Sequence, residues 1–428
     1  MRRMFASLAV PNYRIYFTGM TVSNMGQWMA RTAQSWLVLT VLTDHSATAL
    51  GTVTALQFLP TLFLMPIAGK LADRFPKRRI LMLAQLVGLI DAAVLSTLVI
   101  TGVAELWHVY LIATIDGVGS SFDSPARQSF VSEVVSGRQL SNAISLNSAS
   151  FNMTRLLGPG LAGVLIAIIG TGPVIAVNTV SFAAMIICLA LLKTRDLATP
   201  ARAKDGGSIH EGLRYVRRRP DLMVLLAIGF AVGGLGFNFQ ISNAVMTTGI
   251  FHRGSDAFGL LDSIMGVGAL AAALWSAARH GPRIRHMIIS MAAYTVLGLV
   301  AAFSTNYWVF ALLQAPIGLA TITALVTGNT LLQSHTSASM RGRVLSLWML
   351  MITGITPVVS PVVGHLGDWL GPRATVMFGV ICVGISTVII TWVIMHTDSL
   401  RLRFDSHRRG WWYLERRRVT DEITMPVK

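Results

Sequence analysis

Long apolar segments separated by short polar ones dominate the chain from Tyr13 to His396. Each segment has about 20 residues, which lets an α-helix cross the ~30 Å hydrocarbon core of a bilayer. The apolar residues are continuous within a segment and do not alternate with polar ones, so a closed β-barrel is excluded. The pattern predicts about twelve spans, at residues 13–42, 48–69, 79–101, 105–123, 141–168, 172–192, 220–248, 256–277, 286–303, 307–334, 344–370 and 373–396.

The composition agrees with an all-α polytopic membrane protein. The chain is 53% hydrophobic and only 13% charged, whereas a soluble domain carries roughly a quarter charged residues. The net charge of +16 does not indicate nucleic-acid binding, because the basic residues follow the predicted topology. If the segment Gly69–Arg79 is cytoplasmic, 31 of the 35 Lys and Arg residues lie on that side, and Arg253 and Arg373 on the other. Short Lys/Arg-rich loops stay inside, so we expect both termini in the cytoplasm and contact with anionic lipids.

The chain divides into two similar halves. The longest internal connection, at 193–219, follows the sixth span and separates a bundle at 1–192 from a second one at 220–396, and a basic, aromatic tail occupies 397–428. Span five aligns without a gap with span eleven, pairing Gly163 with Gly364 and Gly170 with Gly371, and a weaker pair in spans two and eight is Gly51 with Gly259. The repeat predicts two pseudo-symmetric six-helix bundles.

The chain carries no signature of an enzyme. It has no HExxH, GxSxG, CxxC or GxxxxGK[ST] motif, and its ten histidines are scattered over loops and span ends. We therefore expect no catalytic residue, no cofactor and no metal site. Without a nucleotide-binding motif, any transport would have to use the gradient of an ion or of the substrate.

The segment between spans two and three, GKLADRFPKRR, resembles a signature of the major facilitator superfamily. That signature reads Gly, three residues, Asp-Arg, one residue, Gly and then basic residues; here Pro76 replaces the second Gly, and both residues suit a tight turn. The resemblance assigns a cytoplasmic gate to the matching residues, which are Gly69, Asp73, Arg74, Lys77 and Arg78. With SFDSPARQSFVSEVV, RLLGPGLAG and RGRVLSL, the chain is similar to the branch that contains siderophore and drug exporters and a lysophospholipid transporter.

Five charged residues that lie well inside predicted spans are candidates for proton coupling: Asp116, Arg155, Arg31, Asp91 and Asp262. A charge in the membrane interior costs at least ~2.5–3.5 kcal/mol unless it faces protein or water. The resemblance implies that span four lines the transport cavity, which makes Asp116 the best proton carrier, with Arg155 or Arg31 as its partner. The alternatives are a static ion pair between spans four and five, a packing role for Asp91 and a hydrated structural role for Asp262.

Polar residues in spans one, seven and ten predict a cavity for amphipathic molecules. The candidates are Asn24, Gln27, Trp28, Gln34, Asn238, Gln240, Asn243, Gln314 and Asn329, and ordinary packing is the alternative for most of them. In span five, Gly158, Pro159 and Gly163 predict a kink and a close approach to a neighbouring helix, because small residues let backbones come together.

These features predict a secondary active transporter with the major facilitator fold in a bacterial cytoplasmic membrane. We expect proton-coupled export of small amphipathic organic molecules, similar to drugs or siderophores, by alternating access of a monomer. The first alternative is a facilitator, importer or lysophospholipid flippase on the same fold. The second is a non-transporting membrane scaffold, in which the central connection and the tail would matter most.

Overall fold

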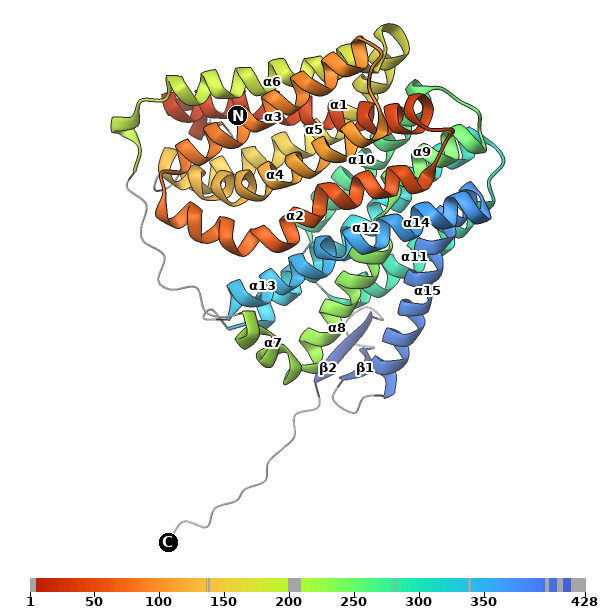
Figure 1. Ribbon diagram of the computed structural model, residues 1–428. Coiled ribbons are helices and arrows are strands. Elements are labelled where there is room, and N and C mark those ends of the chain that lie inside the picture. Colours follow the sequence, from red (N-terminus) through yellow and green to blue (C-terminus); the bar gives the residue numbers. More distant parts are fainter. Residues whose placement is uncertain are drawn as a thin grey trace.

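The protein is a bundle of long helices in the computed structural model (Figure 1). The structure describes residues 5–198 except Ser136 and Arg138, and residues 209–396 except His280, Pro282, Ala338 and Ser339. It also describes two short strands near the end of the chain, β1 (Leu400–Asp405) and β2 (Trp411–Arg416), which pair antiparallel with Leu400 opposite Arg416. The rest of the predicted tail at 397–428 lies outside the described part, and so do the side chains of these two strands.

The first half contains six long helices and three short elements. The helices are α1 (Pro11–Leu37), α2 (Ala47–Arg74), α3 (Lys77–Ile100), α4 (Leu106–Val134), α5 (Gln139–Ile169) and α6 (Thr171–Leu191). The short elements are η1 (Ala6–Ala9), the π-helical turn η2 (Val38–Leu42), which extends α1, and η3 (Thr194–Asp196). Local signals explain several boundaries: Pro11 occupies the first turn of α1, and the Ser46 side chain accepts a hydrogen bond from Ala49 N at the start of α2.

The second half begins with α7 (Ile209–Arg217), a short helix in the connection between the halves. Two of its six long helices are interrupted by π-helical segments. The first consists of α8 (Pro220–Gly229), η4 (Phe230–Leu235) and α9 (Phe239–Gly249). The second consists of α13 (Arg341–Met349), η5 (Leu350–Gly354) and α14 (Thr356–Leu370). The others are α10 (Ser255–Ala278), α11 (Ile284–Phe303), α12 (Tyr307–His335) and α15 (Pro372–His396).

The helices have the length that crossing a membrane requires. Within the described residues, ten segments are both long and apolar enough to span a bilayer. Helices α1 and α4 have 27 and 29 residues but carry too many polar side chains to meet the same measure. The predicted fold class is confirmed, but the predicted end of span four at residue 123 is wrong, because α4 continues to Val134. Asp123 and Arg127 therefore lie within the helix.

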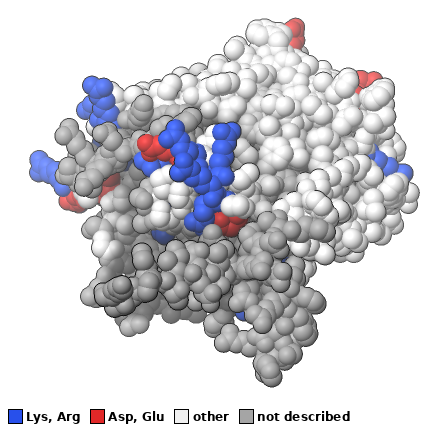
Figure 2. Space-filling model, turned by 90° about the horizontal axis from the view of Figure 1, so that it is seen from below, with Lys and Arg blue, Asp and Glu red and all other residues white. Residues whose placement is uncertain are grey.

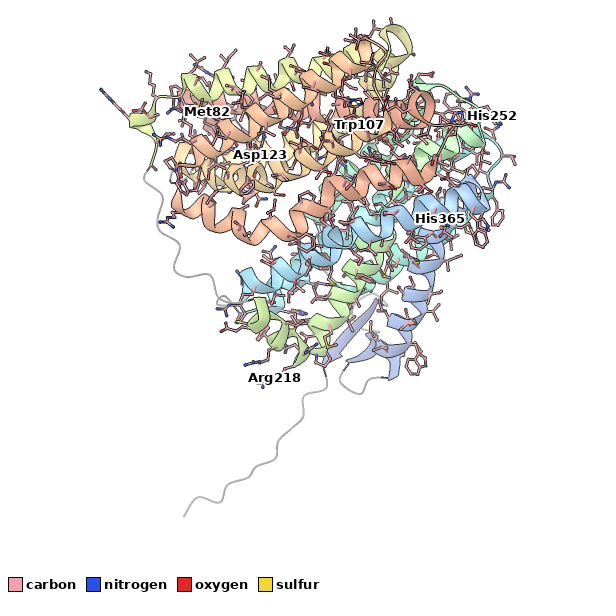
Figure 3. All side chains as sticks on the ribbon, in the orientation of Figure 1. Met82, Trp107, Asp123, Arg218, His252 and His365 are labelled. Carbon is pink, nitrogen blue, oxygen red and sulfur yellow. The ribbon has the colours of Figure 1, made fainter. Side chains whose placement is uncertain are left out.

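The bundle has two chemically different ends. The basic end carries the α2–α3, α4–α5, α6–α7, α7–α8, α10–α11 and α12–α13 connections. The far end carries the α1–α2, α3–α4, α5–α6, α9–α10, α11–α12 and α14–α15 connections. Figure 3 shows Arg218 near the basic end and Trp107 and His252 at the far end. Figure 2 shows Lys and Arg gathered toward one end of the visible face, with mostly uncharged surface beyond them. An uncharged belt between polar ends suits a bilayer-spanning protein.

Matching glycines join the two halves. A Cβ atom on Gly163 of α5 would lie 2.4 Å from Ser255 O of α10, and one on Gly364 of α14 would lie 2.3 Å from Ala47 O of α2. Helices α5 and α10 therefore approach backbone to backbone, as α14 and α2 do, and only glycine fits at these positions. Gly163 and Gly364 are the pair that the repeat aligned, so the repeated glycines form equivalent contacts.

The apolar core that the two halves share lies toward the far end. One buried cluster combines Leu37 and Leu50 of the first half with Val245, Phe258 and Val363 of the second. Two other clusters each belong to one half. The halves are thus closed against each other at the far end.

Candidate transport site

Two arginines of the first half flank one tryptophan near the middle of the bundle. The Cζ atoms of Arg31 and Arg155 lie 5.4 Å and 5.9 Å from the centre of the Trp28 ring. The Arg155 guanidinium also lies 5.3 Å from the ring of Phe237, which belongs to the second half. Cations are attracted to aromatic faces at this range. Helices α1 and α5 pack closely at this point, which brings these groups together. A Cβ atom on Gly158 of α5 would lie only 2.6 Å from Trp28 Cβ of α1, so glycine permits this approach.

A small polar cavity lies inside the first half, among α1, α2, α3, α4 and α6. Its volume for water-sized spheres is about 50 Å³, which is enough for a few water molecules. Its wall includes two of the three acids and one of the two arginines predicted for proton coupling, together with glutamines: Gln27, Arg31, Gln34, Gln57, Asp91 and Asp116. The charges of Asp116 and Arg31 interact, as do those of Asp91 and Asp116. Asp91 is 8% exposed, and its Oδ2 has no hydrogen-bond partner.

Asp262 of the second half lies in a different place, at the interface between the halves. Its Oδ1 accepts a hydrogen bond of 2.8 Å from Asn243 Nδ2, and its charge interacts with that of Arg155. Sequence reasoning proposed Arg155 as a partner of Asp116, but no ion pair within 4.0 Å joins them in the described part of the chain. The charge of Asp116 interacts instead with that of Arg31, and the charge of Asp262 with that of Arg155, although neither pair forms an ion pair within 4.0 Å among the described residues.

The remaining polar candidates divide among three places. Asn238, Asn243 and Gln314 line a cavity of about 20 Å³ within the second half, and Gln314 Oε1 has no partner there. Gln240 Nε2 donates a hydrogen bond of 2.8 Å to Ser35 Oγ across the interface. Each of the other three forms a hydrogen bond within its own half: Gln34 with Gln57, Asn24 with Arg127, and Asn329 with Gln333.

Sequence reasoning missed an ion pair on α4. Arg127 Nε lies 2.8 Å from Asp123 Oδ2, one helical turn away, and Gln85 of α3 donates a hydrogen bond of 2.9 Å to Asp123 Oδ1. Arg127 Nη2 is buried without a partner. The pair was hidden because the span was predicted to end at Asp123, which placed Arg127 in a loop. If the sequence had been assigned a helix of 29 residues from Leu106, the i, i+4 spacing of Asp123 and Arg127 would have indicated the pair.

The residues predicted to form a gate are bound within the first half. Lys77 Nζ lies 2.6 Å from Glu133 Oε1 of α4, and both side chains are buried. Arg78 donates hydrogen bonds to Leu189 O and Ala190 O at the end of α6. Gly69 lies near the end of α2, where Arg74 is exposed, and the side chain of Asp73 lies outside the described part. Lys77 and Arg78 thus tie α3 to α4 and α6 at the basic end.

A carboxylate from the second half caps α2 at the far end. Asp368 of α14 accepts hydrogen bonds from Ala47 N at 2.6 Å, Thr48 N at 3.0 Å and Ser46 Oγ at 3.0 Å. These groups form the positive end of the α2 dipole, where a negative charge is stabilising. Two further bonds cross the interface, from Ser255 Oγ to Gly163 O and from Ser263 Oγ to Leu156 O.

A sequence signal for this cap exists but was not recognised. The segment Gly364–Arg373 reads GHLGDWLGPR, in which Gly, Leu, Asp and a basic residue recur at the spacing of Gly69, Leu71, Asp73 and Arg78. The first segment lies at the basic end of α2, and the second lies at the far end of α14. The spacing of the gate signature therefore recurs at the opposite end of the molecule.

Comparisons with known proteins agree with this architecture. A family model described as transmembrane secretion effector, within the major facilitator superfamily, matches residues 3–408. The chain belongs to this family. It is thus a multi-pass membrane transporter, which confirms the prediction that it is not an enzyme.

The chain is similar along most of its length to two characterised bacterial transporters. The staphyloferrin A transporter of Staphylococcus aureus is 25% identical over 93% of this chain and 99% of its own. The multidrug efflux pump Tap of Mycolicibacterium fortuitum is 26% identical over 85% of this chain and 91% of its own.

Two solved structures share the fold. A bacterial homologue of the lysosomal transporter Spinster, inward-facing and unoccupied, superposes with a TM-score of 0.70 at 15% identity, covering 89% of this chain and 97% of its own. The peptide-transporter family member PepTSo gives a TM-score of 0.71 at 13% identity, covering 90% and 97%. At these identities the likeness concerns the fold, and it confirms the predicted fold class.

Proposed function

We propose that this member of the family exports small amphipathic organic molecules from bacteria in exchange for protons. The names of its relatives support this class of substrate, since one is a siderophore transporter and another a multidrug efflux pump. The distribution of basic residues supports a cytoplasmic location for the basic end and both termini, in the cytoplasmic membrane. With the far end closed, the conformation would then be the inward-facing one.

The observation that carries the coupling proposal is the position of Arg31 and Asp116 in the wall of one polar cavity, where their charges interact. A deprotonated Asp116 neutralises Arg31, whereas a protonated Asp116 leaves the guanidinium charge uncompensated by this acid. Since Arg31 also lies over the Trp28 ring, a proton on Asp116 changes the charge felt by a substrate at that ring. Proton binding and substrate binding would thereby be linked through one charge.

Trp28 and Arg155 are the proposed substrate contacts. Their ring and guanidinium face each other and lie beside Phe237 of the second half, so a bound molecule there would touch both bundles. An aromatic face offers adaptable contact area to planar, amphipathic molecules. When the halves reorient, Phe237 would move relative to Trp28, which would change the binding geometry between the two states.

Transport in proteoliposomes with an imposed pH gradient tests the coupling. Ethidium and staphyloferrin A serve as the drug-like and siderophore probes, and the wild type should move at least one of them in proportion to the gradient. Asp116→Asn should retain exchange of the probe between the two sides but lose its response to the gradient. Asp44→Asn, an exposed acid near the far end, is the matched control and should behave as the wild type.

The outcome separates the alternatives. If wild-type transport ignores the pH gradient, the protein is a facilitator, and if Asp116→Asn keeps the full gradient response, Asp116 is not the proton carrier. Trp28→Ala should raise the probe concentration needed for half-maximal transport about tenfold, because a base or ring stacked on an aromatic side chain contributes ~1–3 kcal/mol. An unchanged value for both probes would remove Trp28 from the binding site.

A further inference from the structure

A cluster of basic groups lies at the α10–α11 connection of the basic end. Arg279 directly follows α10, and Arg283, Arg285 and His286 begin α11. No acidic residue occurs between positions 263 and 397 except Asp368, which is at the far end. The positive charge of this connection is therefore not compensated by its own sequence.

Arg279 has no polar partner among the described residues. Its guanidinium stacks on the Trp275 ring, with Cζ 3.4 Å from the ring centre. Its Nε, Nη1 and Nη2 atoms are all buried without a hydrogen-bond partner, and so is Nδ1 of His286. A guanidinium carries five N–H donors, and leaving such donors unsatisfied is costly. The missing acceptors must therefore come from outside the described chain.

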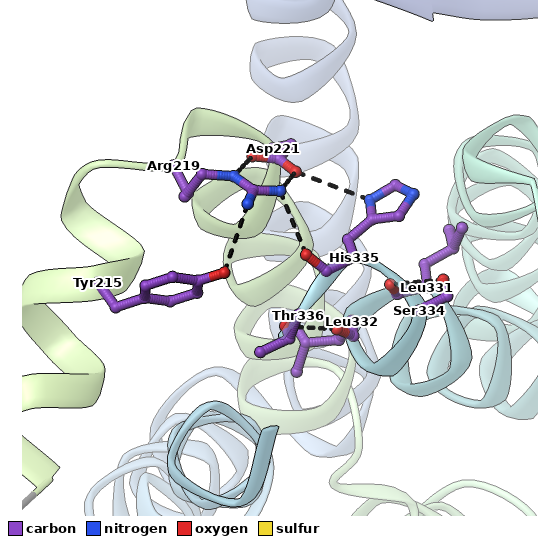
Figure 4. Close-up of polar contacts among 8 residues, drawn as sticks. All are labelled: Tyr215, Arg219, Asp221, Leu331, Leu332, Ser334, His335 and Thr336. Atoms are coloured by element: carbon purple, nitrogen blue, oxygen red, sulfur yellow. Dashed lines mark hydrogen bonds and ion pairs between the residues drawn. The ribbon is translucent and has the colours of Figure 1, made fainter. Parts of the chain in front are cut away.

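The charges around Arg279 favour an anionic acceptor over a neutral one. Burial, and then the charge of Arg285, lower the pKa of the Arg279 guanidinium below its usual range. Arg219, at the same end of the molecule, shows the opposite arrangement (Figure 4). Its Nε and Nη2 donate to the two carboxylate oxygens of Asp221 at 2.9 Å and 2.6 Å, and Nη2 also donates to His335 O. Arg219 is neutralised within the protein, whereas Arg279 is crowded by like charge.

The position of the cluster identifies the class of anion. The apolar stretch of α10 ends at Ser276, and that of α11 begins at Ile284, so the connection lies where the hydrocarbon core meets the headgroups. Leu274 and Trp275, next to the cluster, are 64% and 47% exposed. Exposed tryptophans mark the headgroup level of a membrane, where phosphate groups are the abundant anions. We propose that Arg279 and Arg283, with Trp275, form a binding site for the phosphate of an anionic phospholipid.

The site is independent of the transport site and does not require the protein to be an exporter. The lipid headgroup would lie at the junction of α10 and α11, and α10 is the helix that packs against α5 across the interface. A bound headgroup would satisfy the guanidinium of Arg279 and would hold the end of α10 at a fixed depth in the membrane.

Lipid retention by the full-length protein tests the site. The purified protein in detergent is titrated with dioleoyl phosphatidylglycerol, with dioleoyl phosphatidylcholine or with inorganic phosphate, and bound lipid is counted by native mass spectrometry while the melting temperature is recorded. Phosphatidylglycerol should bind and raise the melting temperature, and the other two should not. Arg279→Gln combined with Arg283→Gln should weaken phosphatidylglycerol binding about 25-fold, since each arginine near an anionic surface contributes about fivefold, or ~1 kcal/mol.

Matched variants keep the result interpretable. Arg218→Gln removes an exposed arginine from the same end of the molecule, and it should bind phosphatidylglycerol as the wild type does. Arg279→Lys should recover part of the affinity, because it restores the charge without the stacked plane. Equal binding of phosphatidylcholine, an equal effect of inorganic phosphate, or equal losses in Arg218→Gln and the double variant would each overturn the lipid site. The melting temperature of the double variant without added lipid shows whether it is folded.

Discussion

The Asp368 cap predicts how firmly the far end is closed. Asp368→Asn keeps one acceptor oxygen near the start of α2 but removes the negative charge that lies against three donors of Ser46, Ala47 and Thr48. A hydrogen bond to a charged group contributes ~1.5–3 kcal/mol and a carboxylate at an exposed helix N-terminus ~0.3–1 kcal/mol. Because Asp368 is exposed, the low ends of these ranges apply, and we expect a loss of ~1–2 kcal/mol.

This energy acts only on the closed far end, because the cap joins two halves that separate there in alternating access. The substitution should therefore shift the equilibrium toward the conformation that is open at the far end by about 5- to 30-fold. Spin labels at Val103 and Thr305, in far-end connections of the two halves, report the change as a longer distance in double electron–electron resonance. Cys188 and Cys382 are first replaced by serine so that only the labelled sites react.

Glu105→Gln is the matched control for this measurement. Glu105 caps α4 within the first half, where its carboxylate belongs to a capping box with His108 and accepts a hydrogen bond from Trp107 Nε1. It should weaken the start of α4 without changing the distance between the halves. A distance distribution for Asp368→Asn that matches the wild type would refute the reasoning, and so would an equal shift in Glu105→Gln.

Two further predictions concern buried contacts. Glu133→Gln should lower the free energy of unfolding by ~3–5 kcal/mol in thermal melts, because it leaves the buried charge of Lys77 without its partner; replacing both residues by Met should cost much less, and equal costs would contradict this account. Gly163→Ala should open the far end and lower the melting temperature, because its Cβ would meet Ser255 O at 2.4 Å, whereas Gly342→Ala, with open space around it, should not. Labelling of far-end cysteines with an impermeant maleimide measures the opening, and an unchanged labelling rate would count against it.

The helices and the internal repeat could be predicted because both depend on local sequence. Continuous apolar segments fix the number of spans, and the pairs Gly163 with Gly364 and Gly170 with Gly371 recur because each occupies an equivalent position. Gly170 and Gly371 each lie between consecutive helices, with φ angles of 82° and 90°. Residues with a Cβ atom rarely adopt such angles. Such positions leave a signal in the sequence alone.

The pairing of charges across helices could not be predicted in the same way. Asp116, Arg31 and Arg155 were each recognised as intramembrane charges, but which acid lies near which arginine depends on the rotation of every helix about its axis. Depth along the membrane favoured Asp116 with Arg155, and the rotation of α1 and α5 associates Asp116 with Arg31 instead. Asp123 escaped attention because hydropathy ends a span at the first cluster of polar residues, whereas a helix ends where its hydrogen bonds do.

The π-helical turn η5 has a consequence for the closure of the far end. It lies between α13, whose Trp348 is buried in the core of the second half, and α14, which carries Asp368. A regular helix advances by about 100° per residue, so deleting one residue from Leu350–Gly354 would leave a continuous helix but turn Asp368 out of line with α2. The number of residues in η5 therefore sets how far Asp368 is rotated about the helix axis relative to Trp348. A relative lacking a residue there would need a different far-end contact, even if every other side chain were the same.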